Sequence, residues 1–378
     1  MWRIQLRVLI ITIVMGCHQQ DRKIEAVATD SADTHCSPGN SSLQRIRVTE
    51  TGVTDSGVLE KNGMVWIPAG IFQMGSPDGF GYKDEHPAHP VSVDGFWMDA
   101  TEVTNVQFAA FVKATNYKTI AERAIDAKEL AKEANVPVSQ INASMLEPGS
   151  LIFHATDRPV PLNNPGQWWS WTSGADWKHP EGPGSDLKNK DNFPVVHIAY
   201  ADAVAYAKWA GKRLPREAEW EWAAMGGNHD AVYAWGGEAI EYNKAKANSW
   251  NGEFPSSNTA WDGFVGLAPV KQFSPNRYSL YDMSGNVWEW CSDLYNSNYY
   301  NDCRAAGLQK NPKGPSKSYD PDEPDIEKHV IRGGSFLCND SYCSGYRVAR
   351  RMKTSTNTSL NHTGFRCVAD SVTGKRAK

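Results

Sequence analysis

The C-terminal part of this chain carries few regular patterns but many large aromatic side chains. After residue 226 helical and strand periodicity is scarce, and Gly, Asn, Pro and aromatic residues dominate. The chain contains 15 Trp, several of them clustered within residues 168–177, 220–222 and 288–290. A body with few helices needs large, rigid side chains to fill an irregular core. The sequence therefore predicts a loop-rich α+β domain in which most Trp side chains pack in the interior.

Composition and charge limit the number of domains and the class of partner. No linker interrupts residues 61–372, and 40% of the 378 residues are hydrophobic, so we predict one large folded domain over that range. The net charge is −4 and no long basic run occurs. Nucleic acid is excluded as a partner because phosphate binding requires clustered Lys and Arg.

The N-terminus has the pattern of a targeting segment. Arg3 and Arg7 flank the start of an apolar run over residues 8–15, which is too short to span a bilayer. Residues 14–17 resemble a bacterial lipobox, which would make Cys17 the lipidated first residue; a cleaved signal peptide with an incidental Cys is the alternative. Residues 18–60 are polar and predict a flexible tether. We expect an exported protein, lipid-anchored in the bacterial cell envelope at the periplasm or outer membrane.

Local signals predict several regular elements within the domain. Strands are expected at residues 64–68, with Pro68 at an end or edge, and at 91–93. Three helices are expected: one capped by Thr104 and Gln107 and stopped by Asn116, one over residues 201–210 before Gly211, and one from Pro215 at its first position to Met225. His86 and His89, each beside a proline, are interpreted as loop residues.

Cys338 and Cys343 stand five positions apart in a Gly-rich stretch, residues 332–347. Gly333 and Gly334 allow a tight turn or a close approach to a ligand. The pair suits a structural disulfide, a redox-active dithiol or a soft-metal site for Cu(I). Zinc would require more ligands than this stretch supplies. Among the other cysteines, Cys291 and Cys303 form a plausible local bridge.

Two further stretches combine carboxylates with turning backbone, a mixture that suits Ca²⁺. One contains Asp282 and Glu289, and the other contains Asn248, Ser249, Asp262 and Phe264. For both stretches the alternative is a turn that satisfies its own polar groups.

Taken together, the motifs resemble the formylglycine-generating enzymes, also called sulfatase-modifying factors. The resemblance runs in order through about residues 64–370 and rests on residues 64–70, 74–75, 99–105, 177–182, 209–215, 217–221, 285–290, 332–335 and 364–367. It implies the loop-rich formylglycine-generating-enzyme fold, which is C-type-lectin-like. It also implies that residues 61–372 form the catalytic domain.

The resemblance implies a copper-dependent oxidase that uses O₂ to convert a cysteine in an unfolded sulfatase polypeptide, within Cys-x-Pro-x-Arg, to Cα-formylglycine. By similarity Cys338 and Cys343 bind Cu(I), Ser335 and Tyr342 line the site, and Trp288 forms part of its wall. Two Ca²⁺ sites are also implied. Their ligands would be Asn248, Ser249, Asp262 and Phe264 in one, and Asp282, Gly285, Val287 and Glu289 in the other.

The chain departs from the family pattern at three positions beside the cysteines. Some relatives have His and Arg where Asn339 and Asp340 stand here, and an Arg at the position of Gly345, so peptide specificity and rate are in question. Positions that pair cysteines in vertebrate relatives are Ala207, Ala224 and Val348 here, which predicts that Cys367 lacks its partner.

Two rival functions share the fold. A non-catalytic surface lipoprotein, of the gliding-motility kind, is expected to lack the cysteine pair that this chain has. A histidine-betaine sulfoxide synthase would bind iron through a His-rich N-terminal module. Residues 18–60 contain only His18 and His35, so the sequence disfavours that branch.

Overall fold

The computed structural model describes residues 60–133, 136–143 and 146–370. The predicted signal peptide, Cys17, Cys36 and the tether before residue 60 lie outside these ranges. Among the described residues, no helix has both the length and the apolar character needed to cross a membrane.

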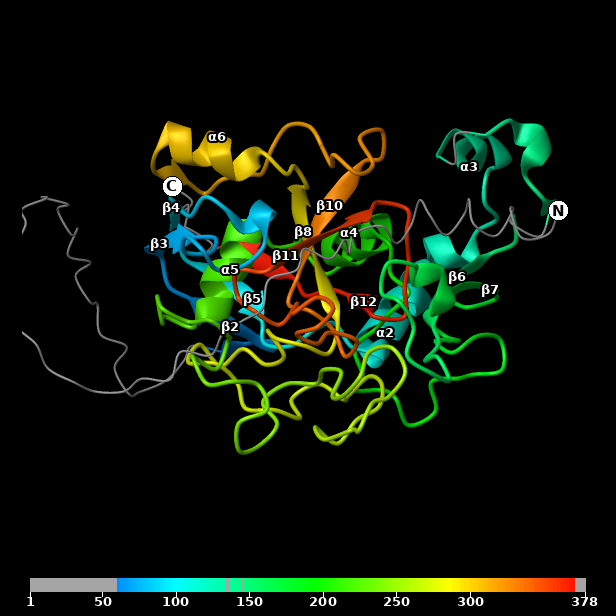
Figure 1. Ribbon diagram of the computed structural model, residues 1–378, viewed down its shortest axis with the longest axis horizontal. Helices are drawn as coiled ribbons and strands as arrows, with labels where there is room; N and C mark the ends of the chain where they lie inside the picture. The colour runs from blue at the N-terminus through cyan, green and yellow to red at the C-terminus, as the bar shows by residue number, and fades with distance from the viewer. Residues whose placement is uncertain (1–59, 134–135, 144–145, 371–378) are drawn as a thin grey trace, which may run out of the picture.

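In the described part of the chain, four small sheets and five α-helices frame the molecule, and long loops fill the space between them (Figure 1). One sheet has the order β1 (Glu60–Lys61), β2 (Met64–Ile67), β5 (Phe96–Asp99), β13 (Val368–Asp370). A second contains β11 (Arg351–Ser355), β10 (Lys328–Arg332), β8 (Trp288–Leu294) and β12 (Thr363–Gly364). The others are β3 (Gly70–Met74), β4 (His89–Val93) and β9 (Gln309–Lys310), and the pair β6 (Gly149–Phe153) and β7 (Trp169–Ser173).

The helices are α2 (Asn105–Thr115), α3 (Ala127–Glu133), α4 (Tyr200–Trp209), α5 (Glu217–Met225) and α6 (Tyr299–Ala306). The observed bounds of α2 and α4 agree closely with the predicted ones. Thr104 N–H donates to Gln107 Oε1 at 2.9 Å at the start of α2, and Asn116 ends it in the left-handed region at φ 53°. The helix predicted over residues 201–210 is α4, shifted by one residue.

Both predicted strands are present, but the interpretation of His89 is wrong. The expected strand at 64–68 is β2, which ends before Pro68, and residues 91–93 lie within β4. His89 was interpreted as a loop residue and is instead the buried first residue of β4, where its ring meets that of Tyr300 at 4.5 Å. The interpretation was wrong because Pro90 occupies a strand position without ending the strand.

The third helix begins two residues later than predicted. Arg216 is the N-cap of α5, since its N–H donates to Glu219 at 2.9 Å. Pro215 therefore precedes the helix rather than occupying its first turn. The end of α5 matches the prediction, because Gly226 follows it with φ 59°.

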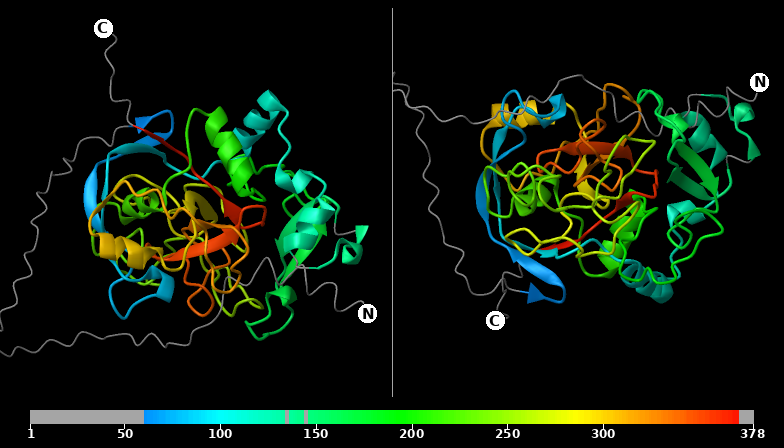
Figure 2. Two further views of the ribbon diagram at one scale, coloured as in Figure 1. Left: turned by 90° about the horizontal axis from the view of Figure 1, so that it is seen from above. Right: turned by 60° about the horizontal axis from the view of Figure 1, so that its bottom comes forward.

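The loop-rich character is confirmed. No helix or strand is assigned between α5 and β8, where residues 226–287 wind across one side of the molecule (Figure 2). Trp168, Trp220, Trp288 and Trp290 are among the largest fully buried side chains, so the predicted packing role holds for them. Trp209 and Trp261 are exposed instead.

The second sheet carries the segment that contains the cysteine pair. β10 and β11 are antiparallel, and their last and first residues, Arg332 and Arg351, pair with each other. Residues 333–350 therefore leave the sheet and return to it at the same point. On the other side of β10, β8 pairs in parallel with β12 through Trp288 and Thr363. The segments around Trp288 and Thr363 therefore lie beside the loop at 333–350, which we call the cysteine loop.

Candidate active site

The glycines at the start of the cysteine loop allow two backbone segments to meet. Gly333 and Gly334 have φ of 96° and 76°, values that L side chains rarely adopt. A Cβ on Gly334 would lie 2.6 Å from the carbonyl carbon of Gly345. The predicted close approach is therefore an approach to the far end of the same loop, and it closes the loop on itself.

Buried ion pairs attach both ends of the cysteine loop to α5 and to the residues before β4. Arg351 donates to both carboxylate oxygens of Glu217 at 2.8 Å, and Arg332 binds Glu217 at 3.1 Å and also Glu221. We call this group the ionic base; it consists of Glu85, Glu217, Glu221, Arg332, Arg347 and Arg351. Its third carboxylate, Glu85, takes a bidentate pair from Arg347 at 2.6 and 2.8 Å.

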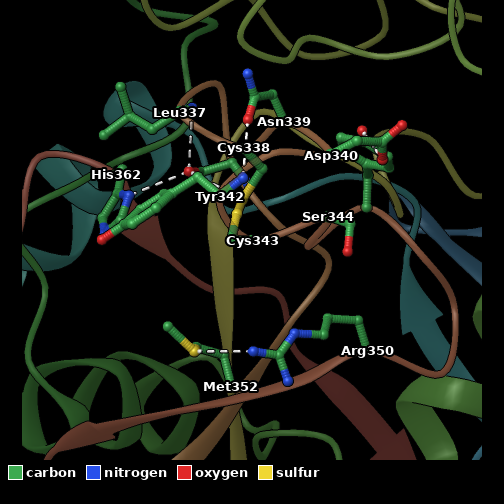
Figure 3. Close-up of a disulfide and its surroundings, with 12 residues drawn as sticks. Leu337, Cys338, Asn339, Asp340, Tyr342, Cys343, Ser344, Arg350, Met352 and His362 are labelled. Carbon is green, nitrogen blue, oxygen red and sulfur yellow. Dashed lines mark hydrogen bonds between the residues drawn. A yellow bond between two sulfur atoms is a disulfide. The ribbon is translucent and has the colours of Figure 1, made fainter. Parts of the chain in front are cut away.

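Within the loop the two cysteines form a disulfide with Cα atoms 5.5 Å apart (Figure 3). Asn339 holds the turn between them: its carbonyl accepts the N–H of Cys343 at 3.0 Å, and its Oδ1 accepts the N–H of Tyr342 at 3.1 Å. In this structure the two sulfur atoms are in the oxidised, disulfide form. Reduction would separate them into two thiols, which bind a metal as thiolates. Both side chains are buried, with Cys338 1% exposed.

The sulfurs line a cavity of about 60 Å³. All five residues that the sequence predicted as catalytic line it together: Ser335, Cys338, Tyr342, Cys343 and Trp288. Trp288 comes from β8 and the other four from the cysteine loop. The sequence analysis missed other lining residues, among them Trp169, Phe254, Met352 and His362. His362 stands two residues before the recognised motif 364–367, which was the one available signal for it.

Aromatic rings cover one side of this cavity. Tyr342 stacks on Phe254, with ring centroids 4.5 Å apart and planes 12° apart, and Trp168 meets both rings edge-on. The indole N–H of Trp168 is buried without a hydrogen-bond partner in the described residues. We call Trp168, Trp169, Phe254 and Tyr342 the aromatic wall. It offers apolar contact next to the sulfurs.

The three departures from the family pattern have structural roles here. Asn339 caps the turn, and its Nδ2 donates to the Gly252 carbonyl at 3.0 Å. Asp340 accepts the Tyr346 hydroxyl at 2.6 Å. A Cβ on Gly345 would lie 2.6 Å from the Trp288 ring and 2.7 Å from Cys338 Sγ. Backbone at residue 345 therefore packs directly against the cavity wall and the first sulfur.

The remaining described cysteines are free thiols. Cys291, Cys303 and Cys367 are all buried and unpaired, so the bridge expected between Cys291 and Cys303 is absent. Cys291 lies in the interior of β8, whereas Cys303 lies on α6 and hydrogen-bonds with Tyr299. The prediction for Cys367, a thiol without a partner, is confirmed.

The predicted Ca²⁺ stretch that contains Asn248, Ser249, Asp262 and Phe264 forms one polar cluster. Asp262 accepts backbone N–H groups from Ser249 at 2.8 Å and Phe264 at 2.9 Å, and burial raises its pKa. Asn248 Nδ2 donates to the Gly266 carbonyl and to Asn286 Oδ1, which fixes the orientation of the amide. Asn248 Oδ1 is then buried without a hydrogen-bond partner. The orphaned oxygen belongs to Asn248, the neighbour in sequence of Ser249, whose N–H binds the buried Asp262 carboxylate, and such oxygens suit a hard cation.

The predicted Ca²⁺ stretch that contains Asp282 and Glu289 is less suited to a cation than the stretch around Asp262. Arg366 binds both oxygens of Glu289 at 2.7 Å, and Trp220 Nε1 donates to Glu289 Oε2 at 2.9 Å, so Oε1 keeps one lone pair. Asp282 accepts the Lys271 N–H at 2.9 Å, and burial raises its pKa to about 6. The adjacent Glu102 has a buried Oε2 without a hydrogen-bond partner. Among the described residues, no three His, Cys, Asp or Glu side chains form a metal cluster, so a ligand set here would need oxygen donors besides the carboxylates.

Comparison with known proteins assigns the family. Residues 50–371 match the sulfatase-modifying factor enzyme 1-like domain. The formylglycine-generating enzyme of Thermomonospora curvata is 44% identical over 82% of this chain and 93% of its own, and that of Mycobacterium tuberculosis is 43% identical over 82% and 99%. An inactive Cα-formylglycine-generating enzyme 2 of Bos taurus is 35% identical over 81% and 87%.

A solved structure supports the fold alone. PvdO from Pseudomonas aeruginosa superposes with a TM-score of 0.54 at 24% identity, over 82% of this chain and 94% of that one. The expected fold class is thereby confirmed. With the domain match spanning most of the chain and the identity to several curated enzymes above 40%, this chain belongs to the family of formylglycine-generating enzymes.

Proposed function

We propose that this protein oxidises the cysteine of a Cys-x-Pro-x-Arg segment in an unfolded sulfatase to Cα-formylglycine, using O₂ and a Cu(I) ion held by Cys338 and Cys343. The observation that carries the proposal is the convergence of both sulfurs with Ser335, Tyr342 and Trp288 on one cavity. Its apolar aromatic wall suits the cysteine and proline of an extended peptide.

The donor set fits Cu(I). Two adjacent sulfurs on a short turn give the low coordination number and the soft ligands that this ion prefers. When bound, Cu(I) would supply one-electron chemistry towards O₂. The chain's own residues would exclude bulk water, hold the two sulfurs in the cavity lining and orient the peptide against the aromatic wall.

The electron balance of the reaction requires a reductant. Converting the substrate CH₂–SH to an aldehyde, with one water taken up and sulfur leaving as H₂S, releases two electrons and two protons. Reducing O₂ to two waters takes four of each, so two electrons and two protons must come from an added thiol, which becomes a disulfide. The same thiol reduces the Cys338–Cys343 disulfide before the metal binds.

The test is direct. Purified protein is reduced, loaded with Cu(I) and incubated in air with a thiol and a Cys-x-Pro-x-Arg peptide, and aldehyde is followed by mass spectrometry. Wild-type protein should form the aldehyde, and Cys338→Ser and Cys343→Ser should not. Absence of product from the loaded wild-type protein would favour the non-catalytic lipoprotein instead.

Calcium binding is proposed for the two stretches described above. Asn248, Ser249, Asp262 and Phe264 would hold one ion, supported by the orphaned Asn248 Oδ1. Asp282, Gly285, Val287 and Glu289 would hold the other, with one oxygen of Glu289 shared between the ion and Arg366. Each ion would offset buried negative charge in or beside the loops at residues 226–287, where no helix or strand is assigned.

Export and lipid anchoring are proposed from the N-terminal sequence. Arg3 and Arg7, the apolar run over residues 8–15 and Cys17 support an anchor in the cell envelope. In a bacterial expression host, wild-type protein should fractionate with membranes, and Cys17→Ala should not carry lipid. Equal lipid labelling of both forms would contradict the anchor.

A further inference from the structure

His362 lines the candidate active site, and the proposed function assigns it no role. Its Nδ1 lies 3.1 Å from Ser335 Oγ, and its ring meets that of Trp169 edge-on at 4.8 Å. The backbone carbonyl of His362 accepts the Trp288 N–H at 2.9 Å, next to the β8–β12 pairing. Backbone and ring thus both have fixed contacts, and Nδ1 faces the Ser335 hydroxyl.

Ser335 Oγ has three neighbours and a single proton to share. The Leu337 N–H donates to it at 3.3 Å, His362 Nδ1 lies at 3.1 Å, and Cys338 Sγ lies at 4.0 Å. A hydroxyl has one O–H and two lone pairs. If Leu337 and a protonated Nδ1 fill both lone pairs, the O–H must point towards the sulfur. If Nδ1 is instead an acceptor, it takes the O–H and the sulfur loses that donor.

The protonation state of His362 limits the possibilities to these two. Burial, together with the nearby His197, lowers the pKa of His362 to about 3. The ring is therefore neutral near pH 7 and carries one N–H, on either Nδ1 or Nε2. The tautomer of His362 thereby decides which way the Ser335 hydroxyl points.

We propose that His362 is a positioning residue: its Nδ1–H turns the Ser335 hydroxyl towards Cys338 Sγ. The Ser335 backbone N–H already lies 3.4 Å from the same sulfur. In the reduced protein, Cys338 would then receive two hydrogen bonds from one residue, and negative charge on its sulfur would be stabilised. The role in turnover rests on the proposed function, whereas the hydrogen-bond arrangement does not.

Two substitutions separate the two ring nitrogens. His362→Asn places an amide near the position of Nδ1, and His362→Gln places one near that of Nε2. In reduced, metal-free protein at one fixed pH, iodoacetamide labelling of Cys338 and Cys343 is resolved by mass spectrometry, and the ratio of the two rates is measured. We expect His362→Gln to lower the Cys338:Cys343 ratio about tenfold or more, the effect of losing one hydrogen bond to a charged sulfur. His362→Asn should stay within about twofold of wild type.

The ratio must also depend on Ser335. Ser335→Ala should lower it as His362→Gln does, and the double variant should show no further loss, since both changes remove one interaction. Equal effects of His362→Asn and His362→Gln, or an unchanged ratio in Ser335→Ala, would overturn the proposal. His329→Asn is the matched control. His329 is a buried histidine, with a pKa lowered to about 4, stacked on Tyr200, and its loss should leave the ratio unchanged.

A kinetic readout connects the arrangement to turnover. With a Cys-x-Pro-x-Arg peptide, His362→Gln should lower kcat with little change in KM, and His362→Asn should restore much of it. An inactive wild-type protein would defeat the proposed function while leaving the labelling ratio as a test of the Ser335–His362 arrangement. Full activity in His362→Gln would remove His362 from the reaction even if the ratio changed.

Discussion

Two buried polar regions of this molecule balance their charge in different ways. In the ionic base beneath the cysteine loop, Arg332, Arg351 and Arg347 are paired with Glu217, Glu221 and Glu85. In the loops around residues 248–289, Asn248 Oδ1 is orphaned and the Asp262 carboxylate is bound by backbone N–H groups. The first region carries its cations in the sequence. The second is suited to an ion from solution.

The difference has a consequence for the candidate active site. Because the charges of the ionic base are balanced by side chains of the protein itself, it can hold the ends of the cysteine loop at any calcium concentration. The loops at 248–289 contact the same loop from the other side: the Phe336 N–H donates to the Asn286 carbonyl at 3.0 Å, and Trp250 N–H to the Cys338 carbonyl at 3.0 Å. We expect their order to depend on the ion.

The largest predicted effect breaks the ionic base. Glu217→Gln leaves Arg351 and Arg332 buried with a lost charge partner, and removing one member of a buried pair costs about 3–5 kcal/mol. Urea unfolding should show this loss with and without Ca²⁺. Glu238→Gln is the control, because the Lys246–Glu238 pair has a carboxylate side chain that is 60% exposed, and its loss should cost at most about 1 kcal/mol. Similar effects of the two variants would refute the distinction.

A pH experiment probes a carboxyl next to the ionic base. Asp293 accepts the Glu217 N–H at 2.9 Å, and burial raises its pKa from 3.8 to about 7. The folded state therefore favours the protonated form. The stabilisation is complete below about pH 4 and is lost as the pH rises to about 7, an amount of up to about 4 kcal/mol by linkage.

Asp293→Asn keeps an acceptor for Glu217 but does not titrate. Its unfolding free energy should therefore change less between pH 5 and pH 8 than that of wild type. Subtracting one curve from the other removes the contributions of all other carboxyls. A flat difference between the two proteins would show that Asp293 is ionised when folded.

The calcium prediction tests the loops around residues 248–289. Saturating Ca²⁺ should raise the stability of wild-type protein by roughly 3 kcal/mol for each occupied site at a hundred times its Kd, and a chelator should reverse this. Asp262→Asn should lose about half or more of the thermal shift, since its carboxylate is the sole charged group of the first site. The ionic-base variant Glu217→Gln should keep the full shift. An Asp262→Asn protein with the wild-type shift would remove the first site.

The smallest predicted effect concerns packing between the cavity and the cysteine loop. Gly345→Ala introduces a Cβ 2.6 Å from the Trp288 ring and 2.7 Å from Cys338 Sγ. Overpacking of this kind costs typically 1–3 kcal/mol, and we expect peptide oxidation to fall as Cys338 is displaced. Gly237→Ala is the matched control, because a Cβ there meets no atom within 4 Å. Equal thermal stability of the two variants would show that the cavity wall moves to accommodate the added methyl group.

Sequence patterns predicted the parts of the fold that depend on local signals. Thr104, Gln107 and Asn116 define both ends of α2 without help from the rest of the chain. The family motifs likewise placed Cys338, Cys343, Ser335, Tyr342 and Trp288, which the structure brings to one cavity. Pro215 misled the start of α5 because the Glu219 side chain, rather than the proline, determines the N-cap.

Contacts between distant segments could not be predicted in the same way. Phe254 reaches the cavity from an irregular loop and His362 from the turn just before the two-residue strand β12, and such segments leave no periodic pattern. The bidentate pairing of Glu217 with Arg351 joins residues 134 positions apart. The bridge between Cys291 and Cys303 failed for a related reason, since nearness in sequence does not bring a strand interior and a helix together.

The most direct test of the central claim is aldehyde formation on a Cys-x-Pro-x-Arg peptide by reduced, Cu(I)-loaded protein in air with a thiol. Wild type should convert the cysteine to formylglycine and release H₂S, while Cys338→Ser, Cys343→Ser and protein kept free of copper should not. The account is contradicted if loaded wild type leaves the peptide unchanged, or if either serine variant retains wild-type conversion.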